Sequence, residues 1–212
     1  MKYQGLIFDL DGVLCSTDRY HYQAWKQLAD EEGLSFDWEM NTKLRGVSRR
    51  ESFEIILSEN GKKFSEDEIE RCITIKNAYY QKLLEQITED DMSSEVRETL
   101  VRLKEAGLKL AVGSSSKNAG LILKQLDGNK YFDEIVDGTQ ITHSKPDPEV
   151  FIKAGERLGV PATQCLVIED APSGVQAAKA AGMDSAGIGA AAEPGLATYQ
   201  LGRFKDLITY VL

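Results

Sequence analysis

Four segments of the chain carry acidic, hydroxyl and basic side chains that could act together on a phosphate group. Asp9 and Asp11 lie two residues apart at the end of an apolar run, and Glu169-Asp170 ends a second apolar run. Three serines, a lysine and an asparagine occupy residues 114–118 after a third run, and Lys145 directly precedes a proline. Because several carboxylates close together repel one another, we expect a cation between them, and all-oxygen ligands favour Mg²⁺.

These residue types are suited to phosphoryl transfer. One carboxylate can attack phosphorus as a nucleophile while a second moves a proton. The hydroxyls of residues 114–116, neighbouring backbone N–H groups and the ammonium of Lys145 could hold phosphate oxygens. The side chains therefore predict a magnesium-dependent phosphoryl-transfer enzyme.

Each segment taken alone has a simpler interpretation. Asp-Leu-Asp-Gly at residues 9–12 is also a turn sequence, although no later acid stands at the spacing of a calcium loop. The serines could form a solvated loop or a helix cap, and Glu169-Asp170 could be an exposed loop. What favours chemistry is the presence of all four, in this order, each after an apolar run or before a helix that begins with proline.

The elements that must position these residues follow from the hydrophobic pattern. Apolar runs predict buried parallel strands near residues 5–9, 108–112, 135–136, 166–168 and 186–189. Helical repeats alternate with these runs from residue 92 on, and residues 190–203 are expected to form a loop. Ligands of such sheets bind at the carboxyl ends of the strands, where the acidic segments lie. The expected fold class is α/β, a Rossmann-like doubly wound parallel sheet core with an inserted α-helical cap domain.

Residues 16–87 are expected to form the inserted cap, and residues 1–15 and 88–212 the core domain. Two capping-box sequences, Ser48-Arg49-Arg50-Glu51 and Ser65-Glu66-Asp67-Glu68, precede apolar helical repeats in the cap. Arg49 would stand in the first turn of its helix, where a basic residue is unfavourable unless it meets an anion.

The composition limits the partners. The 212 residues carry a formal net charge of −9, which argues against an extended nucleic acid. No apolar run reaches the roughly 18 residues that a membrane span needs. The apolar stretch that follows the first residues is too short for a signal peptide. Three widely spaced cysteines fit reduced thiols in the cytoplasm. We expect a cytoplasmic monomer whose partner is a small molecule, with no nucleic acid and no membrane.

The four segments resemble the four motifs of the haloacid dehalogenase-like superfamily: Phe8-Asp9-Leu10-Asp11-Gly12-Val13, then Ser114, then Lys145-Pro146, then Ile168-Glu169-Asp170-Ala171-Pro172-Ser173-Gly174. The paired aspartates look like its phosphotransferase branch. The resemblance implies that Asp9 is the nucleophile and Asp11 the general acid and base. It also implies that Mg²⁺ is held by the Asp9 carboxylate, the Asp11 carbonyl and Asp170, with Glu169 close by, and that Ser114 and Lys145 grip the transferring phosphoryl group.

The helical insertion resembles the cap of the β-phosphoglucomutase family. That likeness implies that Arg49 grips the phosphate that is not being transferred, with help from residues 116–118, and that His21 and Lys76 position the substrate and the acid/base. The expected phosphate- and substrate-binding set is Thr17, His21, Trp25, Arg45, Gly46, Val47, Ser48, Arg49, Ser52, Lys76, Ser114, Ser115, Ser116, Lys117, Asn118 and Lys145. His21 and Trp25 could instead be packed helix residues, and Lys76 could extend along an apolar surface with its charge in water.

The resemblance favours the first of three interpretations of function, and the other two are its alternatives. The first is interconversion of β-glucose 1-phosphate and glucose 6-phosphate through an aspartyl-phosphate and a bisphosphate intermediate. The second is a sugar-phosphate phosphatase, in which water accepts the phosphoryl group. The third is a sugar-phosphate binding protein without catalysis, which would not need Asp9. Ser115 departs from the family pattern, which often has a small apolar residue there, and Arg45 replaces a frequent lysine; such differences bear on the sugar rather than on the nucleophile or the metal.

Overall fold

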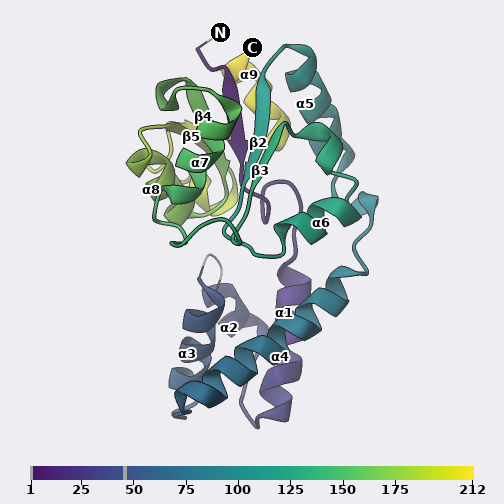
Figure 1. Cartoon of the computed structure of the whole chain (residues 1–212), viewed down its shortest axis with the longest axis vertical. Helices are drawn as coiled ribbons and strands as arrows, with labels where there is room; N and C mark the ends of the chain where they lie inside the picture. Colours follow the sequence, from purple (N-terminus) through teal and green to yellow (C-terminus); the bar gives the residue numbers. More distant parts are fainter. Residues whose placement is uncertain (1, 45–46) are drawn as a thin grey trace. The chain divides into compact units, whose positions relative to one another are not determined.

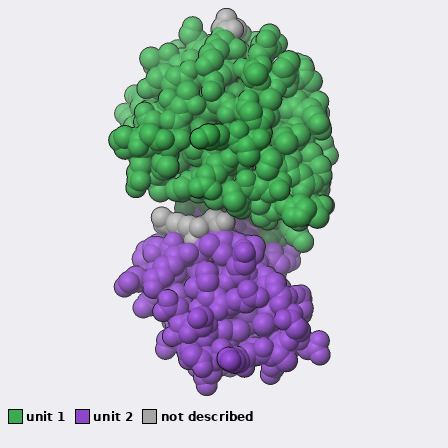
Figure 2. Space-filling model, turned by 90° about the vertical axis from the view of Figure 1, so that its left-hand side faces the viewer, with its two compact units in different colours: residues 1–16, 87–212 green, residues 17–86 purple. Residues whose placement is uncertain are grey.

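The computed structural model describes residues 2–44 and 47–212 (Figure 1). The chain divides into two compact units, residues 1–16 with 87–212 and residues 17–86 (Figure 2). Each boundary differs by one residue from the expected one. Among the described residues, no helix combines the length and the hydropathy needed to cross a bilayer.

The first unit, hereafter the core unit, is built on one parallel sheet with the strand order β3-β2-β1-β4-β5-β6. Its strands are β1 (Gly5–Phe8), β2 (Lys109–Gly113), β3 (Glu134–Val136), β4 (Cys165–Glu169), β5 (Asp184–Gly187) and β6 (Tyr199–Gln200). Every pairing between neighbours is parallel. This order is that of a doubly wound sheet whose direction of winding reverses between β1 and β4. The predicted fold class is confirmed.

Helices cover both faces of the sheet, which explains why its central strands are continuous apolar runs. The helices of this unit are α5 (Ser94–Glu105), α6 (Ala119–Gln125), α7 (Glu149–Leu158), α8 (Pro172–Ala180) and α9 (Leu207–Val211). On one face Ile7 packs with residues of α7 and α8 such as Phe151 and Ala177. On the other face the neighbouring Phe8 contacts the rings of Phe132 and Phe204 at centroid distances of 6.0 and 5.8 Å.

The second unit, hereafter the cap unit, consists of helices: α1 (Asp18–Glu31), α2 (Trp38–Lys43), α3 (Arg49–Glu59) and α4 (Glu66–Leu84). Both predicted capping boxes are confirmed. The side-chain oxygens of Ser48 and Ser65 each accept a hydrogen bond from the N–H of the third helical residue, and the serine backbone N–H donates to the glutamate side chain of that residue. Trp25 of α1 stacks on Phe53 of α3 at 5.9 Å within the apolar core of this unit.

The prediction of a loop over residues 190–203 is wrong in part. The structure has a 3-10 turn at Gly189–Ala192 and the edge strand β6 within that range. Two residues of β6 are too few for a periodic signal, so the strand is defined by its pairing with Ala186 and Gly187 rather than by its own sequence.

Candidate active site

The carboxyl ends of the two central strands bring the acidic segments together. Asp9 follows β1 directly, and its backbone N–H continues the ladder by donating to Ile168 O of β4 at 2.9 Å. Glu169 is the last residue of β4 and is 1% exposed. Because β1 and β4 are adjacent and parallel, their carboxyl ends place Asp9, Glu169 and Asp170 at one edge of the sheet.

Lys145 reaches this edge from the segment before α7 and connects two of the acids. Its Nζ lies 2.5 Å from Asp9 Oδ1 and 2.6 Å from Glu169 Oε1, and only 8% of its side chain is exposed. Burial alone would lower the pKa of Lys145, but the charges of Asp9 and Glu169 and their hydrogen bonds outweigh it and raise that pKa. The lysine is therefore a fixed positive charge beside the predicted nucleophile.

The same edge can hold a cation. Asp9, Glu169 and Asp170 each offer a carboxylate oxygen, and the three atoms lie within 4.8 Å of one another. Burial, and after it the charges of Asp9, Glu169 and Asp11, raise the pKa of Asp170 to about 8. A bound divalent ion would offset the mutual repulsion of these neighbouring carboxylates, and the all-oxygen donor set fits Mg²⁺.

Two glycines make room for these carboxylates. A Cβ at Gly12, whose φ is +80°, would lie 2.1 Å from Asp170 Oδ2, and a Cβ at Gly174 would lie 1.9 Å from Glu169 Cδ. Gly12 also closes the turn after β1 by donating its N–H to Cys15 O at 2.7 Å. This turn carries Asp11, the predicted acid/base, whose side chain is partly buried. The Asp-Gly sequence is thus a turn, and the turn belongs to the acidic edge.

The serine segment forms an N–H-lined loop between β2 and α6. Ser114 is 3% exposed and donates its N–H to Val136 O at 3.0 Å, which fixes the start of the loop against β3. The hydroxyl of Ser114 accepts the N–H of Ser116, and the hydroxyl of Ser116 accepts the N–H of Asn118, both at 3.2 Å. Lys117 is exposed and Asn118 is buried at the N-cap of α6. A helix N-terminus with hydroxyls before it suits an anion.

In the cap unit, two of the predicted residues, His21 and Trp25, lie against a third, the buried Lys76. Lys76 of α4 is 2% exposed, and its Nζ lies 2.9 Å from His21 Nδ1 of α1. The same ammonium lies 4.7 Å from the ring centroids of Trp25 and of Tyr80. Its charge is held inside the unit, so the alternative in which Lys76 extends into water is wrong.

The electrostatics of this cluster keep His21 neutral. Burial, followed by the charges of Lys76 and Arg49, lowers the pKa of His21 well below its usual value. Tyr80 stacks on His21 at a centroid distance of 4.1 Å and donates its hydroxyl to Thr17 Oγ1 at 2.9 Å. Tyr80 was not predicted as a site residue; its position four residues after Lys76, on the same helical face, is the signal that could have found it.

The start of α3 holds a second cationic group of the cap unit. Arg49 is the first residue of α3, and burial lowers the pKa of its guanidinium. Within the described residues it has no carboxylate partner, whereas the adjacent Arg50 pairs with Glu54, Glu66 and Glu70. Other predicted residues lie beside it: Val47, Ser48 as the N-cap, and Ser52, which is buried. Arg45 and Gly46 were also predicted and lie outside the described residues.

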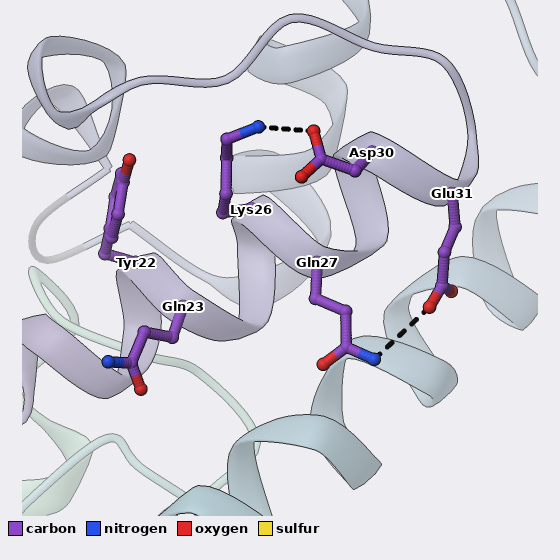
Figure 3. Close-up of a pocket in the computed structure, with 6 residues that line it drawn as sticks. All are labelled: Tyr22, Gln23, Lys26, Gln27, Asp30 and Glu31. Carbon is purple, nitrogen blue, oxygen red and sulfur yellow. Dashed lines mark hydrogen bonds and ion pairs between the residues drawn. The ribbon is translucent and has the colours of Figure 1, made fainter.

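A shallow pocket lies on the cap unit along α1 (Figure 3). It contains none of the predicted site residues and is lined by Tyr22, Gln23, Lys26, Gln27, Asp30 and Glu31. Its polar groups bind one another, since Lys26 pairs with Asp30 and Gln27 donates to Glu31. The predicted site residues lie elsewhere, at the acidic edge and serine loop of the core unit and around Lys76 and Arg49 of the cap unit.

Comparisons with known proteins agree with this chemistry. A family model of haloacid dehalogenase-like hydrolases matches residues 6–188. The chain is 40% identical over 188 residues to the beta-phosphoglucomutase of Bacillus subtilis, across 88% of this chain and 83% of that protein. It is 33% identical to the phosphorylated carbohydrates phosphatase of Thermotoga maritima, across 85% of this chain and 82% of the other.

A third relative and a solved structure are again named as a phosphatase and a mutase. The fructose-1-phosphate phosphatase of Escherichia coli is 33% identical over 184 residues, across 87% of this chain and 95% of that protein. The crystal structure of beta-phosphoglucomutase from Clostridium difficile superposes with a TM-score of 0.89 at 36% identity, across 99% of this chain and 95% of that one. Mutases and phosphatases of phosphorylated sugars thus stand among the similar proteins.

Proposed function

Because the chain belongs to the haloacid dehalogenase-like hydrolase family, we propose that it is a phosphomutase that interconverts β-glucose 1-phosphate and glucose 6-phosphate. The observation that carries this proposal is the Asp9–Lys145–Glu169 arrangement at the carboxyl edge of the sheet, in a chain 40% identical to a beta-phosphoglucomutase. The arrangement supports covalent transfer through Asp9. The sequence identity supports a sugar hydroxyl, rather than water, as the acceptor of the phosphoryl group.

In the proposed reaction, the phosphoryl group moves between Asp9 and the sugar. A phosphorylated Asp9 donates its phosphoryl group to the free hydroxyl of the sugar monophosphate, and Asp11 takes the proton of that hydroxyl. The resulting bisphosphate then reorients in the site, so that its other phosphate faces Asp9. Asp9 then attacks its other phosphate, the bond from phosphorus to the sugar oxygen breaks, and Asp11 returns the proton to that oxygen. The net result is an isomerised monophosphate and a regenerated phosphoenzyme.

The remaining residues of the core unit act by charge and position. Lys145 supplies positive charge beside Asp9, where the transferring phosphoryl oxygens carry negative charge. The hydroxyl O–H groups of residues 114–116, which still have their own protons to donate, and the Lys117 ammonium would hold phosphate oxygens before α6. Asp9, Asp170 and the Asp11 carbonyl would hold Mg²⁺ with Glu169 close by, and the ion would offset the charge of the carboxylates and of the phosphoryl group.

The cap unit would supply the substrate contacts. Arg49 has no carboxylate partner among the described residues, and its place in the first turn of α3 favours an anion, so we assign it to the phosphate that is not being transferred. His21, held neutral, accepts from the Lys76 ammonium at Nδ1, so its proton lies on Nε2, which can donate a hydrogen bond to a sugar hydroxyl.

A sugar-phosphate phosphatase is the second candidate, since two relatives that are 33% identical carry that activity. The core unit would serve either reaction, because water and a sugar hydroxyl attack the same phosphoaspartate. The test supplies β-glucose 1-phosphate, a trace of the 1,6-bisphosphate and Mg²⁺, and follows both products. A mutase makes glucose 6-phosphate without free phosphate. Release of phosphate without glucose 6-phosphate would contradict the mutase proposal and support the phosphatase.

A further inference from the structure

The segment that carries Lys145 has no helix or strand of its own. Residues 137–148 run irregularly from the end of β3 to the start of α7. Yet the Lys145 ammonium is placed within 2.6 Å of both Asp9 and Glu169. Irregular backbone holds one conformation only where other groups bind its N–H and C=O groups. The contacts of this segment therefore decide where the lysine lies.

Glu149, the first residue of α7, binds two consecutive residues of this segment. Its Oε2 accepts the backbone N–H of Thr142 at 2.8 Å and that of His143 at 2.9 Å. Its Oε1 accepts Lys153 Nζ, which also donates to Gln140 O at 2.6 Å. The Glu149 carboxylate and the Lys153 ammonium thus bind the backbone at three residues that lie shortly before Lys145: Gln140, Thr142 and His143.

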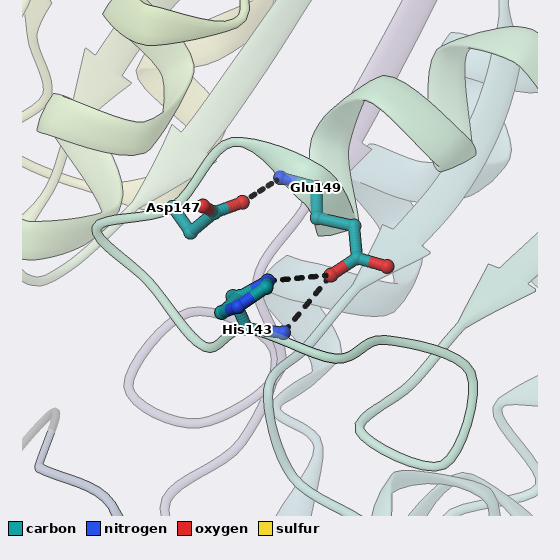
Figure 4. A group of neighbouring side chains, drawn as sticks. All are labelled: His143, Asp147 and Glu149. Carbon is teal, nitrogen blue, oxygen red and sulfur yellow. Dashed lines mark hydrogen bonds and ion pairs between the residues drawn. The ribbon is translucent and has the colours of Figure 1, made fainter.

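The same neighbourhood could be taken for a metal site. His143, Asp147 and Glu149 turn toward one another at the start of α7, with ligand atoms within 4.8 Å (Figure 4). The hydrogen bonds argue against this. Both oxygens of Glu149 already accept donors, and Asp147 Oδ1 accepts the N–H of Glu149 at 2.9 Å. The hydrogen bond from Lys153, and to a smaller extent those from the two N–H groups, lower the pKa of Glu149 to about 2. The carboxylate therefore stays ionised and bound to these donors.

Lys145 is also held from the side of the serine loop. Its backbone N–H donates to Ser115 Oγ at 3.3 Å. On its other side, Asp147 donates its N–H to Ser144 O at 3.1 Å, which closes the turn around the lysine. These two contacts flank the lysine, and the Glu149 contacts anchor the residues that lead to it.

We propose that Glu149 is a positioning residue for Lys145: together with Lys153 it holds residues 140–143 so that the Lys145 ammonium lies between Asp9 and Glu169. The role of Glu149 in the reaction rests on the proposed function, in which Lys145 contacts the transferring phosphoryl group. The placement of Lys145 itself does not depend on that function, and it can be measured without substrate.

The first experiment measures the reactivity of Lys145 with an amine-acylating ester, lysine by lysine, by mass spectrometry. In the parent protein this side chain is 8% exposed and should react slowly. Glu149→Ala frees the segment and should raise the rate at Lys145 at least tenfold. Glu149→Gln keeps an oxygen that can accept both N–H groups, so its rate should stay within threefold of the parent rate.

Two controls separate local release from general loosening. Glu156→Ala removes an exposed acid further along the same helix and should leave the Lys145 rate unchanged. Lys76, the other deeply buried lysine discussed above, should keep its low rate in every variant. A parental Lys145 rate in Glu149→Ala would overturn the proposal, and so would an equal rise at Lys76.

The second experiment is a double-mutant cycle on turnover. Glu149→Ala should lower kcat about tenfold in the parent background but less than twofold in Lys145→Ala, because the two residues then act as one unit. Losses that add in the double variant would show that Glu149 does not act through Lys145. If the parent protein turns over neither as a mutase nor as a phosphatase, the proposed function fails, and the lysine rates still decide the placement.

Discussion

The two units of the molecule each bury a lysine, and they do so with opposite surroundings. Lys145 of the core unit lies between two carboxylates, Asp9 and Glu169. Lys76 of the cap unit lies against a neutral imidazole and the faces of Trp25 and Tyr80. An ion pair places charge where a reaction develops charge, whereas aromatic faces attract a cation through the quadrupoles of their rings. In the proposed function, the core unit carries out the transfer and the cap unit recognises the substrate.

Removing the core lysine should have the largest effect of the substitutions compared here. Lys145→Met leaves Asp9 and Glu169 buried without their cation, which costs about 3–5 kcal/mol of unfolding free energy. The loss of a charge beside the phosphoryl group should also lower kcat about 10²–10³-fold. Urea unfolding in magnesium-free buffer and steady-state kinetics measure the two effects. An unfolding free energy equal to that of the parent would contradict the described ion pairs.

Removing Arg49 should weaken binding without a comparable loss of stability. Arg49→Ala should reduce the affinity for a hexose bisphosphate and for the monophosphate by roughly 2–5 kcal/mol, as expected for a desolvated charge pair. Calorimetric titration measures it. The matched control is Arg50→Ala, since Arg50 is the adjacent cation and lies in solvent-screened surface pairs with glutamates. Equal affinity losses in both variants would remove Arg49 from the site.

Removing the cap lysine should sharpen the comparison of the two lysines. Lys76→Met keeps a long apolar side chain against Trp25 and Tyr80. We expect its unfolding free energy to fall by less than about 1.5 kcal/mol, as for a volume-conserving core change, and its KM to rise more than its kcat falls. A stability loss as large as that of Lys145→Met would contradict the distinction between the units.

The smallest effect concerns pH and Glu149. The folded pKa of Glu149 is about 2, below its ordinary value of 4.5, so its contribution to stability is complete above about pH 4.5 and is lost as the pH falls toward 2. The difference in melting temperature between the parent and Glu149→Gln should therefore be constant near neutral pH and shrink below pH 4.5. Circular dichroism melts across that range measure it. A difference that does not change with pH would contradict the folded pKa.

The sequence alone could predict the elements whose signals are local. The apolar run before Asp9 and the capping boxes at Ser48 and Ser65 each depend on a few neighbouring residues, and the structure has them as expected. The strand β6 and the helix α9 were missed because pairing and burial, rather than their own short sequences, define them.

Contacts between distant residues could not be predicted in the same way. The bond between His21 and Lys76 joins residues 55 positions apart, and the contacts of Glu149 with the segment before Lys145 depend on how an irregular backbone folds back on a helix. The sequence pattern supplied the residues of the acidic edge, and the family resemblance supplied their expected roles. Which atoms meet there follows from the register of β1 with β4.

The central claim is that Asp9 is the residue that carries the phosphoryl group. The most direct measurement mixes the protein with Mg²⁺ and glucose 1,6-bisphosphate, stops the reaction with acid within milliseconds, and locates the phosphoryl group by mass spectrometry of the digested chain. The account predicts a phosphorylated Asp9 in the parent protein and neither phosphorylation nor turnover in Asp9→Asn. A phosphoryl group on any other residue, or full turnover by Asp9→Asn, would contradict it.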